Sequence, residues 1–130
     1  MAHSNPAPNN GTYATTKSAF ASFLQHLSSE IPTSKIQMVS IHPGAVFTPG
    51  TRKIGLTENS LKWDNEELCG AFSVWVSTKA AAFLHGRFVW ANWDVEELLE
   101  RKDEINREGM LKMGLQGSSF FDAYGSMQVT

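Results

Sequence analysis

Two short apolar segments, separated by a long amphipathic one, constrain the fold of this chain most strongly. Residues 35–42 (KIQMVSIH) alternate apolar and polar side chains and stop at a Pro-Gly pair, which predicts a strand followed by a turn. Residues 87–91 (RFVWA) predict a second strand, and residues 64–85 predict a helix that a glycine ends. A connection this long joins parallel strands and packs its helix on the sheet.

Two more helices flank this unit. The first is predicted from Thr12 to Ser29, with one buried apolar stripe at helical spacing: Phe20, Phe23, Leu24 and Leu27. The third is predicted from about residue 94 to 108, again followed by a glycine. Asp64 and Asp94 each stand three residues before a glutamate, which predicts the N-caps of the second and third helices.

The predicted elements form one α/β domain with two parallel strands and three main helices. Residues 1–11 are expected to be an irregular lead-in, and residues 118–130 are a weakly patterned tail. Between the first strand and the second helix, residues 45–63 predict a long loop of the kind that serves as a lid or binding segment. Two strands make a poor sheet, because an isolated pair is marginal in water and parallel sheets are normally covered on both faces. We therefore expect oligomerisation to complete the fold.

Composition excludes several classes of function. The formal net charge of −2, without a local basic patch, gives no attraction to nucleic acid or anionic membranes, and no apolar run is long enough to span a bilayer. Cys69 is the only cysteine, so no internal disulfide or cysteine-based zinc site can form, and the four histidines lack ligand spacing. These features predict a cytoplasmic protein without a metal.

Tyr13 and Lys17 form a Tyr-x-x-x-Lys step near the start of the first helix. Residues four apart lie on one helical face, so the phenol and the ammonium can share one site. A phenol is hardly ionised at neutral pH, so little of the phenolate that could act as a base is present. A nearby cation favours ionisation to the phenolate. The pair is therefore a candidate for acid/base chemistry.

Three blocks in this order resemble the C-terminal half of a short-chain dehydrogenase/reductase. They are the Tyr13/Lys17 pair, the strand and turn VSIHPGAVFT at residues 39–48, and the helix at 65–85 with GRFVWANWDVEELL at 86–99. The resemblance covers about residues 11–117, and residues 12–117 are assigned to a domain like the C-terminal half of a short-chain dehydrogenase/reductase. The run into KDEI and LKMGL is similar to filamentous-fungal members. It implies a partial Rossmann-like fold and an NAD- or NADP-dependent oxidoreductase acting on a small carbonyl or alcohol.

The resemblance also implies roles for individual residues. Tyr13 would be the general acid/base, and Lys17 would supply the cation and hold the nicotinamide ribose. The other cofactor-binding residues implied, which would border the nicotinamide, are Pro43, Gly44, Val46 and Thr48.

Two features of the family pattern are missing from this sequence, the glycine-rich turn and the catalytic serine. No glycine-rich G-x-x-x-G-x-G or G-x-G-x-x-G turn occurs, so no tight turn and helix N-terminus receive a pyrophosphate. The family's catalytic serine is not carried onto Ser4, which stands in no matching motif. This argues against cofactor binding by the chain alone and leaves the choice between NAD and NADP, and the substrate, undetermined.

Three functions follow from these observations. In the first, implied by the resemblance, the chain would be a short-chain oxidoreductase that works only with a nucleotide-binding half from elsewhere: either that half is a separate chain, or this chain is a truncated gene product. Alternatively, Tyr13 and Lys17 serve a cofactor-independent enzyme, such as an isomerase, cyclase or dehydratase of a biosynthetic pathway. A third reading is a non-catalytic protein that associates with itself, as a homodimer or higher oligomer, or with a partner.

Overall fold

The computed structural model describes residues 9–114, and the remaining parts of the predicted lead-in and tail, residues 1–8 and 115–130, lie outside this range. Within it the chain forms two strands and several helices, in an order close to the predicted one. The elements are α1 (Gly11–Glu30), β1 (Ser40–His42), α2 (Pro49–Lys53), α3 (Glu66–Val76), the 3-10 helix η1 (Lys79–Leu84), β2 (Phe88–Trp90), α4 (Val95–Glu100) and α5 (Lys102–Arg107).

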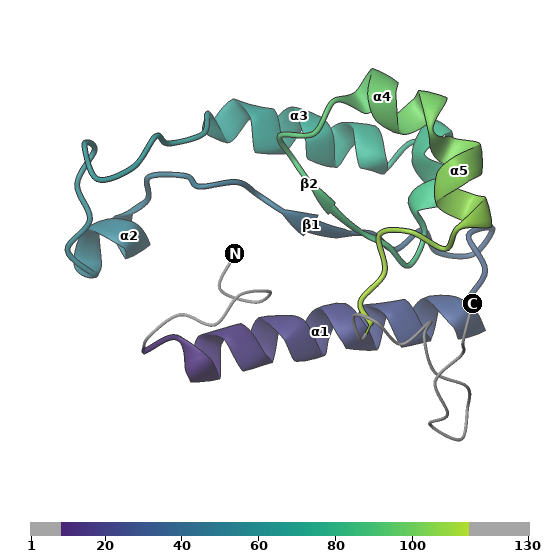
Figure 1. The fold of residues 1–130 in the computed structure, drawn as a ribbon, viewed down its shortest axis with the longest axis horizontal. Coiled ribbons are helices and arrows are strands. Elements are labelled where there is room, and N and C mark those ends of the chain that lie inside the picture. Colours follow the sequence, from purple (N-terminus) through teal and green to yellow (C-terminus); the bar gives the residue numbers. More distant parts are fainter. Residues whose placement is uncertain (1–8, 115–130) are drawn as a thin grey trace, which may run out of the picture.

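The two strands pair in parallel, as the long connection predicts. Ser40 lies opposite Phe88, Ile41 opposite Val89 and His42 opposite Trp90. Among residues 9–114 these strands make a two-stranded sheet, with α1 on one side and α3 on the other in Figure 1. The α/β class and the parallel pair are confirmed, and both strands are shorter than predicted.

Alternation along the strands gives the sheet two different faces. Val89 is fully buried, and Ile41, its partner in register, packs against the same hydrophobic cluster. Side chains at the alternate positions point to the opposite face, where Ser40, His42 and Phe88 line a cavity together with residues of α1. One face of the sheet therefore holds the core, and the other faces the helix that carries Tyr13.

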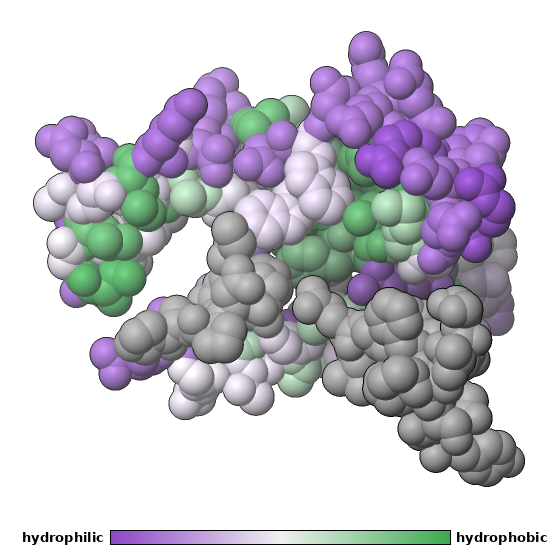
Figure 2. All heavy atoms as spheres, viewed as in Figure 1, coloured by the Kyte–Doolittle hydropathy of each residue, from purple (hydrophilic) through white to green (hydrophobic). Residues whose placement is uncertain are grey.

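The core lies almost entirely on the C-terminal side of the chain. Its buried members come from α3, η1, β2, the residue after β2, α4 and α5: Phe72, Val76, Ala81, Leu84, Val89, Ala91, Leu98 and Ile105. Charged side chains cover the outer face of α4 and α5, which is the hydrophilic upper right of Figure 2. This part of the molecule has the interior that its amphipathic pattern predicts.

The helix predicted over residues 64–85 is divided in two. Asn65, not Asp64, is the N-cap of α3, since its side chain accepts a hydrogen bond from the Glu67 N–H at 2.9 Å. The helix ends at Val76 and the chain continues as η1 before Gly86, whose φ is +72° as a left-handed stop requires. The predicted start was wrong because two adjacent residues, Asp64 and Asn65, are both good caps.

The third predicted helix is also divided. Asp94 is confirmed as an N-cap, accepting hydrogen bonds from the N–H groups of Glu96 and Glu97 at 2.7 and 3.1 Å. Arg101 separates α4 from α5 with a backbone (φ −91°, ψ 6°) that is not helical, and Gly109 follows α5 with a φ of +62°.

The buried stripe predicted on the first helix is wrong at Phe20 and Phe23, whereas Leu24 and Leu27 are half-buried; α1 has the predicted bounds within one residue. Ala21 is its only buried residue, whereas Phe20 and Phe23 are 61% and 57% exposed. The spacing of these side chains identified a helix correctly, but spacing alone does not show what covers the helix. Within the described residues, the apolar side of α1 is largely uncovered.

Several polar contacts hold the last turns of α1. His85 Nδ1 accepts a hydrogen bond from the Met38 N–H, and Nε2 lies 3.1 and 2.9 Å from the carbonyl oxygens of Ser28 and Ile31. Gln25 donates to the Met113 carbonyl at 3.1 Å and accepts from the Met113 N–H at 2.7 Å. The C-terminal half of α1 is thereby tied to His85, which also binds the segment before β1, and to the segment after α5.

Arg87 is a buried cation at the base of β2. Its guanidinium donates to the carbonyls of Phe83 and Met110 and to the side-chain oxygen of Asn106. Burial lowers the pKa of Arg87. The residue therefore ties η1, α5 and the following segment together through neutral acceptors.

None of the helices within residues 9–114 has both the length and the apolar character needed to cross a bilayer.

Candidate functional site

Tyr13 and Lys17 lie together on α1, as their spacing requires. The Lys17 Nζ lies 5.5 Å from the centroid of the Tyr13 ring, and Tyr13 is 58% exposed. Both side chains line a cavity of about 350 Å³ between α1 and the sheet. The phenol and the ammonium are thus near neighbours at the opening of one cavity.

The wall of this cavity opposite α1 is the end of β1 and the turn that follows it. His42, Pro43 and Gly44 contribute to the lining, together with Phe88 of β2. Two of the predicted cofactor-binding residues, Pro43 and Gly44, therefore lie at the same cavity as Tyr13 and Lys17. The fold brings together residues about 30 positions apart in the sequence.

The Pro43–Gly44 turn is fixed by two side chains. The Gly44 N–H donates to His42 Nδ1 at 3.0 Å, and the Ala45 N–H donates to Asp64 Oδ2 at 2.7 Å. Gly44 has a φ of +92°, and a Cβ at this position would lie 2.5 Å from Asp64 Oδ2. Only glycine suits both the backbone conformation and this close approach.

Val46 and Thr48, the other two predicted cofactor-binding residues, lie outside the lining of this cavity. Val46 is half-buried in the segment before α2. Thr48 is the N-cap of α2 and forms a capping box with Thr51, and it borders a separate hollow beside Phe47 and Arg52. Their roles toward a nicotinamide remain predictions.

The loop between β1 and α3 has its own small aromatic centre. The rings of Phe47 and Trp63 lie 5.2 Å apart, and the Arg52 guanidinium lies 5.3 Å from the Phe47 centroid. The Trp63 indole N–H lies within hydrogen-bond distance of the carbonyls of Thr57 and Glu58. The segment predicted as a lid or binding loop is thus an ordered arm that contains α2.

Asp64 is the residue of this site that the sequence did not identify. Its predicted role as a helix cap is taken by Asn65, and its carboxylate instead holds the turn after β1. A second hydrogen bond, from the Asp64 N–H to the Ala45 carbonyl at 2.7 Å, joins the two ends of the loop between β1 and α3. No local spacing signals this contact, because the partners are 19 residues apart.

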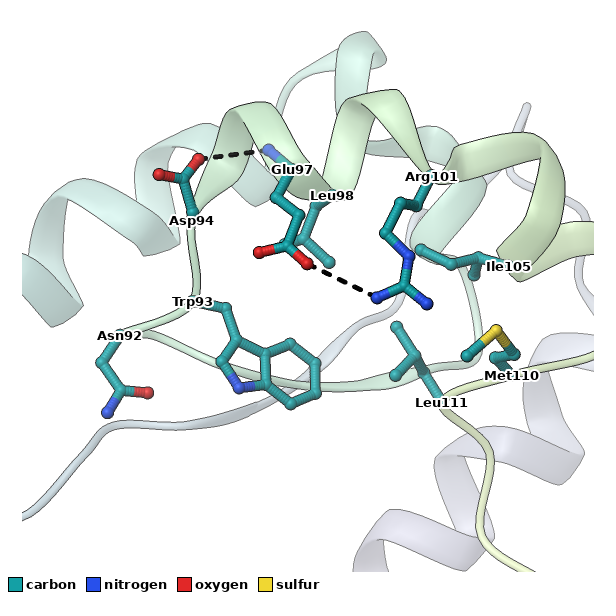
Figure 3. A pocket seen from close by; sticks show the side chains of 9 residues that line it. All are labelled: Asn92, Trp93, Asp94, Glu97, Leu98, Arg101, Ile105, Met110 and Leu111. Atoms are coloured by element: carbon teal, nitrogen blue, oxygen red, sulfur yellow. Dashed lines mark hydrogen bonds and ion pairs between the residues drawn. The ribbon is translucent and has the colours of Figure 1, made fainter.

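A larger cavity of about 520 Å³ lies elsewhere, among the residues that follow β2, helices α4 and α5, and the segment after α5. Figure 3 shows Trp93 and Leu111 below the ion pair that Glu97 and Arg101 form at 3.4 Å. Hydrogen bonding to Glu104 raises the pKa of Arg101. Neither Tyr13 nor Lys17 reaches this cavity, so the acid/base pair belongs to the smaller one.

Metal ligands do not gather in the part of the chain that the structure describes. Residues 9–114 contain no group of three or more His, Cys, Asp or Glu side chains placed to hold a metal ion. Cys69 is a free, half-buried cysteine on α3.

Comparison with known proteins gives consistent matches to one family. The model of the family "short chain dehydrogenase" matches residues 1–59, a range that includes Tyr13, Lys17 and the Pro-Gly turn. A short chain dehydrogenase/reductase of Claviceps purpurea is 38% identical over 112 residues, which are 84% of this chain and 38% of that protein. The short chain dehydrogenase/reductase nsrO of Aspergillus novofumigatus is 38% identical over 72% of this chain and 33% of its own length.

A third relative, the short chain dehydrogenase pgmD of Aspergillus terreus, is 36% identical over 78% of this chain and 33% of its own length. No solved structure gave a significant match. The chain therefore belongs to the short-chain dehydrogenase/reductase family. It spans between 33% and 38% of the length of these three relatives.

Proposed function

We propose that these residues form the proton-transfer part of an NAD(P)-dependent oxidoreductase that acts on a small carbonyl or alcohol. The supporting observation is the cavity that Tyr13 and Lys17 of α1 share with Pro43 and Gly44. In this proposal the Tyr13 hydroxyl gives a proton to the substrate oxygen in reduction and takes it in oxidation. The Lys17 ammonium, 5.5 Å from the centroid of the Tyr13 ring, is proposed to hold the nicotinamide ribose.

In this proposal the cavity receives only the nicotinamide end of the cofactor. Pro43, Gly44 and Lys17 would hold the nicotinamide end, and Thr48 is proposed to approach it from the start of α2. When bound, the nicotinamide supplies or accepts the hydride. The 130 residues contain no glycine-rich turn for the pyrophosphate, so we propose that a segment outside this sequence, in the same or another polypeptide, supplies that site. The unpaired edge of β1 in the described sheet supports this.

Binding of reduced nicotinamide mononucleotide and of NADPH, followed by nicotinamide fluorescence, tests this proposal. If the chain holds only the nicotinamide end, both compounds bind with affinities within about tenfold of each other. Lys17→Met weakens both, whereas Lys35→Met, the matched change at an exposed lysine, does not. NADPH binding that is several orders of magnitude tighter than binding of the mononucleotide would show that a pyrophosphate site is present.

Tyr13→Phe separates proton transfer from binding. The ring remains but the hydroxyl is lost, so we expect nicotinamide binding to persist and turnover to fall by at least about 10²-fold. Turnover is measured in a protein that joins these residues to a nucleotide-binding half from the family. Undiminished turnover in Tyr13→Phe would exclude Tyr13 as the acid.

We also propose that a second copy of the chain covers α1, giving a homodimer in the cytoplasm. The support is the exposed side chain of Phe23, which lies outside the lining of the candidate cavity, whereas Phe20 belongs to that lining. Light scattering at micromolar concentration is expected to give a dimer mass for the protein and a monomer mass for Phe23→Ser. The matched change Ile54→Ser, at a 75% exposed side chain next to α2, should leave the dimer intact.

A further inference from the structure

His42 occupies a special position between the sheet and the candidate cavity. It is the last residue of β1 and lies opposite Trp90 in the parallel register. The two rings are stacked, with centroids 4.2 Å apart and planes inclined by 12°. The stack fixes the orientation of the imidazole on the face of the sheet that lines the cavity.

The orientation of the ring gives Nδ1 a defined partner. The Gly44 N–H, two residues further along the chain, donates to Nδ1 at 3.0 Å. A backbone N–H can only donate, so Nδ1 is unprotonated and the neutral ring carries its proton on Nε2. This is the pattern of an Asx-turn, in which an Asn or Asp oxygen accepts from the N–H two residues on.

The turn held in this way is the one that borders Tyr13 and Lys17. Gly44 is in the left-handed region, and its amide is fixed by His42 while the next amide is fixed by Asp64. Without an acceptor at residue 42, the half-buried Gly44 N–H would have to find another partner or leave this conformation. The wall of the cavity opposite α1 would then change.

We propose that His42 is a positioning residue of the site, which sets the Pro43–Gly44 turn through its Nδ1 acceptor and shapes the cavity beside Tyr13 and Lys17. The expected effect of this turn on nicotinamide binding rests on the proposed function. The hydrogen bond itself is tested independently of any activity.

The test compares His42→Asn with His42→Leu by amide hydrogen exchange in the full chain. The two side chains have nearly the same shape and both remove the stacked ring, but only asparagine keeps an acceptor. The protection of the Gly44 amide is divided by that of the Ala91 amide, which donates to the His42 carbonyl and reports on the sheet. We expect this ratio to stay within about threefold of the original in His42→Asn and to fall about tenfold in His42→Leu.

His42→Phe supplies a third variant, since it keeps a ring against Trp90 and lacks the acceptor. The ratio should fall as it does in His42→Leu. Equal ratios in the asparagine and leucine variants would overturn the proposal, and because the ratio is normalised to the sheet, a general loss of stability does not imitate the result.

Binding of reduced nicotinamide mononucleotide then tests the consequence for the cavity. We expect affinity within about threefold of the original for His42→Asn and about tenfold weaker for His42→Leu. Equal affinity in both variants would overturn the positioning role. If the original chain does not bind the mononucleotide while the exchange ratios follow the expected pattern, the proposed function fails and the control of the turn by His42 stands.

Discussion

The two halves of this molecule are stabilised in different ways. From α3 to α5, side chains such as Leu84 and Val89 are fully buried in one cluster. On α1, Phe20 and Phe23 are more than half exposed, and the helix is tied down at its C-terminal end by Gln25 and the contacts of His85. The part that carries the candidate pair Tyr13 and Lys17 therefore depends on polar contacts at one end of its helix, whereas the other part has a core of its own.

The comparison predicts its largest effect for matched phenylalanine substitutions. Phe72→Ala removes a side chain that is 3% exposed and should lower the free energy of unfolding by about 3–5 kcal/mol. Phe20→Ala, at a 61% exposed position, should lower it by about 0.5 kcal/mol or less. Urea unfolding at low protein concentration measures both, and similar losses would contradict the division into two halves.

A second pair of substitutions tests the junction between the halves. A Cβ on Gly86 would lie 2.1 Å from Ser28 Oγ of α1, and its φ is +72°. Gly86→Ala should therefore cost about 2–4 kcal/mol, from left-handed strain and overpacking together. Gly109 has a similar φ of +62°, but a Cβ there would meet no atom within 4 Å. Gly109→Ala should therefore cost only the left-handed strain, about 1–2 kcal/mol.

The difference between the two glycine variants isolates the contact with α1. In the double variant Gly86→Ala with Ser28→Gly, the part of the free energy of unfolding that overpacking removes should be recovered. The part that left-handed strain removes should stay lost. No recovery in the double variant would show that Ser28 is not the obstacle.

The same division decides how much could be predicted from the sequence. The helical region of α1, the parallel strands, the Asp94 cap and the left-handed Gly86 follow from local patterns, and the structure confirms them. The pairing of Tyr13 with Lys17 is also local, since it needs only the helical repeat. Apart from the parallel pairing, which follows from the length of the connection between the strands, these features depend on neighbours along the chain.

The parts that were not predicted depend on distant contacts. The exposure of Phe20 could not be predicted, because the spacing of apolar residues identifies a helix but not the element that packs against it. The role of Asp64 depends on a turn 19 residues earlier, and the His42–Trp90 stack depends on the register of two strands. The candidate cavity therefore could be predicted only as far as its α1 wall and its Pro-Gly turn.

A smaller effect is expected at Gln25, the other tie of α1. Gln25→Leu removes two hydrogen bonds with the Met113 backbone and should cost about 1–2 kcal/mol. Gln25→Glu keeps the acceptor for the Met113 N–H and loses the donor, so its cost should fall between zero and that of leucine. Exchange of the Met113 amide should accelerate in Gln25→Leu more than in Gln25→Glu. If neither variant changes it, the tie contributes nothing to α1.

The smallest effect is expected in the ion pairs on the surface of the well-packed half. Arg101 donates to Glu104 at 2.9 Å, and this hydrogen bond lowers the pKa of the Glu104 carboxyl. A carboxyl whose pKa is lower in the folded state contributes stability above its unfolded pKa. That contribution is lost as the pH falls through the folded pKa. Glu104→Gln should therefore lower the urea midpoint slightly at pH 7, and the difference should vanish in acid.

Salt distinguishes this pair from the interior contacts that surround it. Both partners are open to solvent, so about 1 M salt should remove most of the difference between the protein and Glu104→Gln at pH 7. The effect of Phe72→Ala should persist in the same salt, because it arises from lost packing. A Glu104 effect that survives both acid and salt would mean that this carboxylate supports the bend at Arg101 through its geometry rather than its charge.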